Sequence, residues 1–85
     1  MNRDAQPVEW ALWIDELEDA RQHLEELIQS LMETGRFDEA DFRVNLGHVY
    51  AHLNRAWHSR SLLGAITEEL WPRFSRFPTD LDPVG

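Results

Sequence analysis

Two of the four histidines, His48 and His52, lie four residues apart in a segment with helical periodicity. That spacing puts both imidazoles on one face of a helix, where they could share a transition-metal ion. Earlier in the chain, Glu16, Asp19 and His23 recur at spacings of three and four residues and therefore also share a helix face. A metal site could be assembled from either group.

The histidine pair also has a simpler interpretation. His48 and His52 fall on a polar stripe with Asn45 and Arg55, opposite the apolar stripe of the same helix, which predicts solvent-exposed side chains. An arginine one turn further on would repel a cation, and the sequence lacks the Glu-x-x-His signature of di-iron helical bundles. We therefore expect surface histidines and no cofactor, with a metal site at His48 and His52 as the alternative.

Arg43 and His48 form the pattern R-x4-H. This short pattern is similar to the catalytic motif of HEPN-type ribonucleases, which are all-helical proteins that work as dimers. The resemblance covers six residues and implies RNA cleavage that depends on Arg43. Residues five apart on one helix point about 140° away from each other, so the pair could act together only with a second chain. The alternative is that Arg43 pairs with an acidic neighbour.

Charge is distributed unevenly along the chain. Twelve of the sixteen acidic residues lie in the first 41 positions, beside three arginines, whereas the other 44 positions carry four acids and five arginines. The net charge of −8 argues against direct binding to nucleic acid or an anionic membrane, because phosphate groups bind basic patches. The acidic stripe of Asp15, Asp19 and Glu26 predicts a solvated helix face, a docking surface for a basic partner, or a mimic of nucleic acid.

The composition excludes several kinds of chemistry. The sequence has no cysteine, so disulfides, thiolate zinc sites and a cysteine nucleophile are ruled out. All eight basic residues are arginine, which excludes Schiff-base chemistry and a P-loop lysine and hints at a GC-rich, bacterial coding sequence. No apolar run approaches the roughly 20 residues of a membrane span, and no signal peptide is visible. We expect a cytoplasmic protein.

Two long helices follow from the periodicity of the apolar residues. The first is expected over about 7–34, from Pro7 at its start to Gly35 just after its end. The second is expected over about 38–58, with Asp38 as its cap. The short connection predicts an antiparallel hairpin. Folding the chain there would place Trp57 roughly opposite Glu16.

The pattern changes after residue 58, where the apolar residues move to another face of the helix. This change predicts a third short helix over about 62–71, after a break at 59–61, or else one continuous long helix. Pro72 is expected to end the helix, and the tail over 72–85 is expected to be irregular, with its aromatic residues packed down. Gly47 predicts a close approach of the first helix.

Together these features predict a single all-α domain over 1–85: a long antiparallel helical hairpin, a short third helix and an irregular tail. Two such chains are expected to form a helical-bundle homodimer. The expected function is non-enzymatic, that of an interaction or accessory module whose partners are a second copy and an unidentified protein. Its candidate docking residues lie at the aromatic end and on the acidic face: Trp13, Trp57, Arg60, Trp71, Asp15, Asp19 and Glu26. The alternatives are the metal site, the nucleic-acid mimic and the ribonuclease.

Overall fold

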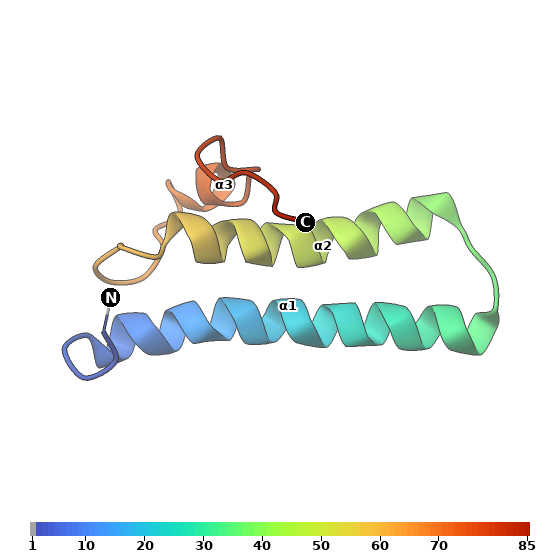
Figure 1. Ribbon diagram of the computed structural model, residues 1–85, viewed down its shortest axis with the longest axis horizontal. Coiled ribbons are helices and arrows are strands. Elements are labelled where there is room, and N and C mark those ends of the chain that lie inside the picture. The colour runs from blue at the N-terminus through green and yellow to red at the C-terminus, as the bar shows by residue number, and fades with distance from the viewer. Residues whose placement is uncertain (1) are drawn as a thin grey trace.

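The computed structural model describes residues 2–85, which form the helices α1 (Pro7–Thr34), α2 (Glu39–His58) and α3 (Trp71–Phe74) and contain no β-strand. The two long helices pack against each other, side by side along most of their length (Figure 1). Contacts pair Trp13 with Ala56 and His23 with His48, so they run in opposite order along the two helices. The all-α prediction is confirmed. Over the described residues, every helix is too short or too polar to cross a membrane.

The ends of both long helices follow from local sequence signals. Pro7 occupies the first turn of α1, where its missing N–H costs nothing. Gly35 follows α1 in the left-handed conformation, with φ of 61°, and its N–H donates to the Leu31 carbonyl at 3.0 Å. Asp38 caps α2 by accepting a hydrogen bond from the Asp41 N–H at 3.0 Å. The predicted helices over 7–34 and 38–58 are therefore confirmed to within one residue.

The register between α1 and α2 differs from the predicted one by about one turn. The prediction placed Trp57 opposite Glu16, whereas Glu16 lies against His52 and Arg55. The residues that connect the helices, 35–38, run back beside the last turn of α1, so that α2 begins about one turn before the end of α1. An extended connection of this kind shifts every later contact along α2.

The predicted helix over 62–71 is wrong. α2 ends at His58, and the residues over 59–70 form turns and bends, with Gly64 at φ of 89°. Such a positive φ is incompatible with a helix that runs through residue 64, as the predicted helix over 62–71 would. Pro72 lies in the first turn of α3, so this proline begins a helix and does not end one.

The buried apolar core is small. Its members are Ala20, Leu27, Val49 and Ala56, and no large side chain is fully buried among the described residues. The tail adds contacts on the far side of α2, where Phe77 stacks on Tyr50 with 5.6 Å between ring centroids. α3 packs against α2 (Figure 1). This confirms that the aromatic residues of the tail pack down.

Gly47 does not mark a close approach of the helices, as the sequence had suggested. A Cβ atom built on this glycine would meet nothing within 4 Å. We expect Gly47→Ala to stabilise the protein by about 1 kcal/mol, because alanine is the better helix former. Gly35→Ala is the matched control and should destabilise it by about 1 kcal/mol, since its φ is positive. Thermal unfolding followed by circular dichroism measures both; two shifts of the same sign would contradict this account.

Asp80 joins the tail to the end of α2. Its carboxylate accepts a hydrogen bond from the Trp57 indole at 2.9 Å and lies 3.4 Å from Arg60. The Trp57 hydrogen bond, helped by Arg60, holds the pKa of Asp80 below the ordinary value of 3.8. The contact therefore stabilises the tail above that ordinary pKa, and this contribution is lost as the pH falls through the lowered value.

We expect the indole N–H resonance of Trp57 to titrate with a midpoint below 3.8 in proton–nitrogen NMR spectra. The indole of Trp13 is the internal control, because it donates to the backbone carbonyl of Ala56 and not to a carboxylate. A midpoint at or above 3.8 would contradict the assigned contact. So would a Trp13 resonance that moves in parallel, since that would report unfolding of the chain.

Candidate metal centre

Three histidines meet where α1 and α2 pack together. His23 of α1 and His48 and His52 of α2 each offer a ring nitrogen, and these atoms all lie within 4.8 Å of one another. The ring centroids of His23 and His48 are 4.0 Å apart, and that of His52 lies 5.2 Å from His23 and 4.9 Å from His48. We call these three residues the histidine cluster. The sequence predicted the pair on α2 but assigned His23 to a separate group.

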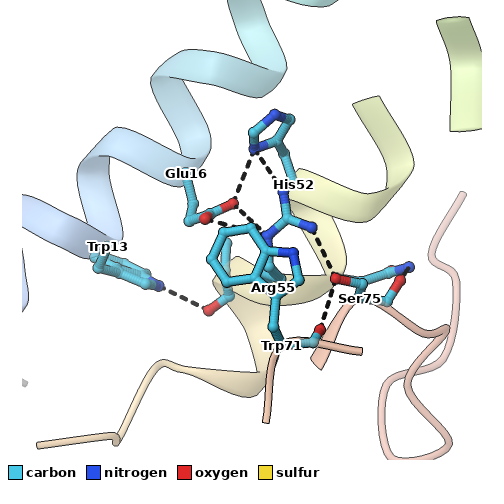
Figure 2. A network of polar contacts seen from close by, with 8 residues as sticks. Trp13, Glu16, His52, Arg55, Trp71 and Ser75 are labelled. Carbon is cyan, nitrogen blue, oxygen red and sulfur yellow. Dashed lines mark hydrogen bonds and ion pairs between the residues drawn. The ribbon is translucent and has the colours of Figure 1, made fainter. Parts of the chain in front are cut away.

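His52 is the buried member of the cluster, held by a carboxylate of the opposite helix. Glu16 extends from α1 toward α2, and its Oε2 lies 2.9 Å from Nδ1 of His52 (Figure 2). His52 is only 8% exposed. The expectation that His48 and His52 would both lie on a solvated face is therefore wrong for His52. The face of α2 that carries His52 and Arg55 packs against α1, where both side chains contact Glu16.

Arg55 completes a buried polar network around Glu16. Its Nε donates to both carboxylate oxygens at 3.2 and 3.1 Å, and its Nη1 donates to the Ser75 hydroxyl at 2.7 Å. Its guanidinium lies 4.2 Å from the centre of the Trp71 ring. The repulsion that Arg55 was expected to exert on a cation is thus offset by the carboxylate paired with it.

The hydrogen-bond partners of His52 indicate which of its ring nitrogens carries the proton. Glu16 can only accept a hydrogen bond, so we infer that Nδ1 is protonated and donates to it. Arg55 Nη2 also lies 3.0 Å from Nδ1, but an unprotonated Nδ1 would face the anionic oxygen of Glu16 lone pair to lone pair at 2.9 Å. Nε2 then carries a free lone pair. This atom is buried, has no hydrogen-bond partner among residues 2–85, and points away from Glu16 and Arg55 (Figure 2).

The other two rings are also suited to donate a lone pair. Nδ1 of His23 faces the Glu26 carboxylate at 3.7 Å, which favours a proton on that nitrogen and leaves Nε2 free. Desolvation lowers the pKa of His48 below 6.5, and His23, His52 and Arg55 lower it further against the opposing effect of Asp19. The lowered pKa keeps the His48 ring in the neutral form that binds metals.

The cluster is close to a coordination geometry but is not yet one. A tetrahedral Zn²⁺ with bonds of about 2.0–2.1 Å holds its ligand nitrogens roughly 3.3 Å apart. The rings of His23 and His52 are instead nearly parallel, with an interplanar angle of 17°. His48 is exposed and His23 half-buried, so both side chains have room to rotate toward the fixed ring of His52.

The predicted docking residues at the aromatic end make contacts within the chain. Trp13 donates to the Ala56 carbonyl at 2.9 Å. The Trp57 indole donates to Asp80, and the guanidinium of Arg60 lies 3.7 Å from the centre of the Trp57 ring. The fourth of these residues, Trp71, lies against Arg55. Arg55 and Arg60 therefore each place a guanidinium group over a tryptophan ring.

The acidic candidates and Arg43 of the R-x4-H pair lie outside the histidine cluster. The acidic residues are exposed on α1: Asp15, Asp19 and Glu26. Arg43 is exposed on α2 and pairs with Glu39 at 3.5 Å. The other member of that pattern, His48, belongs to the histidine cluster, and the R-x4-H pattern thus spans two separate environments.

Sequence reasoning named Glu16 as a possible metal ligand beside Asp19 and His23, but it missed that Glu16 and Arg55 hold His52 in place. Glu16 is an acid on the face of α1 that carries the apolar seam, and this unusual position was the available signal. Comparison with protein-family models, with curated proteins and with solved structures finds no match, so the assignment of this site stands on its geometry.

Proposed function

We propose that the protein binds a divalent transition-metal ion through His23, His48 and His52. The observation that carries this proposal is the buried, unpartnered Nε2 of His52. A buried acceptor without a partner costs about 1–3 kcal/mol, and a metal bound to its lone pair removes that cost. One ring nitrogen from each of the three histidines lies within 4.8 Å of the other two, which makes a ligand shared by the three rings the best account of this arrangement.

Zn²⁺ fits this set of donors best. Three neutral imidazoles and no thiolate suit zinc, copper or nickel, whereas magnesium and calcium require oxygen ligands. Three protein ligands leave a fourth tetrahedral position for water or an exchangeable ligand. The exposed side of the cluster, next to His48, is where that position would open. We therefore propose an open site and not a closed structural one.

Glu16 would act through His52 as a positioning residue. A histidine that binds a metal usually donates its second N–H to a carboxylate, which fixes the ring and raises its basicity. The contact of 2.9 Å between Glu16 and His52 provides this support, and Arg55 fixes the carboxylate in turn. On α1, Glu26 also faces a histidine of the cluster, but its carboxylate lies 3.7 Å from Nδ1 of His23, a longer distance than that between Glu16 and His52.

The direct test is Zn²⁺ binding by the tag-free chain after treatment with a chelator. Isothermal titration should give one ion per chain, and His52→Ala should weaken binding by more than about 100-fold, since two imidazoles rarely hold zinc firmly. His58→Ala is the matched control. Its ring stacks on Phe74 and contacts the Arg76 carbonyl outside the cluster, so this variant should bind as the wild type does.

Two results would contradict the metal proposal. In the first, the wild type binds none of Zn²⁺, Cu²⁺ and Ni²⁺ more tightly than the His52→Ala variant does. The other is equal weakening by His58→Ala, which would point to nonspecific surface binding. Circular dichroism of each variant before titration verifies that the helices remain intact.

The role of Glu16 can be tested separately. Glu16→Gln keeps the shape of the side chain but removes the charge that orients His52, and should raise the Kd for Zn²⁺ by about 10- to 100-fold. Glu26→Gln should have a smaller effect, because its carboxylate is exposed and 3.7 Å from His23. Competition with a chromogenic chelator measures both constants. An unchanged Kd for Glu16→Gln in a folded protein would remove Glu16 from the site.

An association role is a second proposal, and a separate observation favours it. Large apolar side chains of both long helices remain exposed, Leu24 and Leu53 among them. Five of them lie on one side of the pair of helices, and the leucines of each helix recur there at the seven-residue spacing of a packing seam: Leu17, Leu24, Ile28, Leu46 and Leu53. The expected interaction module would use this surface, since the tryptophans at the aromatic end already make contacts within the chain.

A further inference from the structure

The chain exposes more surface than a compact monomer of its size. Its accessible surface is 6670 Å², whereas a folded monomer of 10.0 kDa exposes roughly 5,200 Å². Its radius of gyration is 14.7 Å, against about 12 Å for a compact domain of 85 residues. The excess surface is therefore about 1,400 Å². A fold with so small a buried core is incomplete as a single layer of helices.

Part of the exposed apolar surface forms a continuous face along both long helices. It comprises Leu17, Leu24 and Ile28 of α1 and Leu46 and Leu53 of α2, each between 37% and 49% exposed. Leu17 and Leu24 are seven residues apart, as are Leu46 and Leu53. Because Trp13 is level with Ala56 and His23 with His48, Leu17 is level with Leu53 and Leu24 with Leu46. We call these five residues the leucine face.

We infer that the leucine face binds the same face of a second copy, so that two chains form a four-helix bundle. The seven-residue repeat and the matched levels would stack leucines from all four helices in successive layers. If each chain covers its excess of about 1,400 Å², the total of about 2,800 Å² lies in the range of obligate homodimers. The interface would supply the core that the single chain lacks.

Charge selects one of the two possible arrangements. α1 carries eight acidic residues and one arginine, a net charge of −7, whereas α2 carries two acids and two arginines and is neutral. Packing α1 against α1 would bring two strongly acidic helices together. Each α1 therefore lies against α2 of the second copy, with the two-fold axis parallel to the helices. The two α1 helices are then diagonal to each other.

The histidine cluster lies on the other side of the pair of helices. Leu24 and Leu53 directly follow His23 and His52, so each points about 100° around its helix from its histidine. Because α1 and α2 run in opposite directions, the rotation from histidine to leucine turns both leucines toward the same face of the pair of helices. Dimerisation thus leaves the metal centre accessible, with one site per chain, and either proposal can fail without the other.

The first test is the mass of the wild-type chain and of two variants by sedimentation velocity. The wild type should have twice the monomer mass of 10.0 kDa. Leu53→Glu places a charge in the proposed interface and should weaken the dimer on the order of 100-fold. Val44→Glu is the control, because this residue is 71% exposed and nine residues earlier, on the opposite side of α2. It should leave the dimer intact.

Cysteine cross-linking tests the arrangement without relying on a disruptive variant. The sequence has no cysteine, so single substitutions report directly. Chains with Leu24→Cys mixed with chains with Leu46→Cys should form a disulfide-linked pair on mild oxidation, in preference to Leu24→Cys linked to itself. A monomeric wild type, a dimer that Val44→Glu disrupts as strongly as Leu53→Glu, or preferential Leu24→Cys self-linkage would each overturn the inference.

Discussion

The rest of the structure depends on the Glu16 carboxylate, which α1 inserts between two residues of α2. It contacts His52 at 2.9 Å and Arg55 at 3.1 Å, and Arg55 extends the network to Ser75 in the segment after α3. Glu16 and Arg55 together therefore connect both long helices and the tail. A buried carboxylate is tolerated only where its charge is paired and its oxygens accept hydrogen bonds, so this contact permits very few alternative positions for α2.

This constraint matters because the apolar core is too small to define the register of the helices. Ala20, Leu27, Val49 and Ala56 are small or middle-sized, and sliding one helix by a turn would cost them little contact. Sliding Glu16 away from Arg55 would leave a buried arginine without its carboxylate, which costs several kcal/mol, on the order of 3–5. The polar network thus selects the register, and the register brings His23 to His48 and His52.

The sequence was sufficient for the parts of the fold that local signals determine. Pro7, Gly35 and Asp38 set helix ends through their own backbone preferences, and apolar periodicity revealed the two long helices. The position of His23 beside His48 depends instead on the path of residues 35–38, for which no periodicity exists. The apolar stripe of α2 also suggested the wrong face of this helix for the contact with α1, and this error separated His23 from the pair on α2. Likewise, Pro72 fits the start of a helix as well as its end, and only the turn at Gly64 decides between them.

The order of residues along each helix connects the two proposed surfaces. In both His23–Leu24 and His52–Leu53, a histidine on one face is followed by a leucine on the other. Each leucine of α1 on this face is level with a leucine of α2. A second copy packed on these leucines would therefore hold α1 and α2 in the register that Glu16 selects. The same register sets the distances between the imidazoles. Association on the leucine face would therefore preorganise the histidine cluster on the opposite face, although no residue of the second copy reaches it.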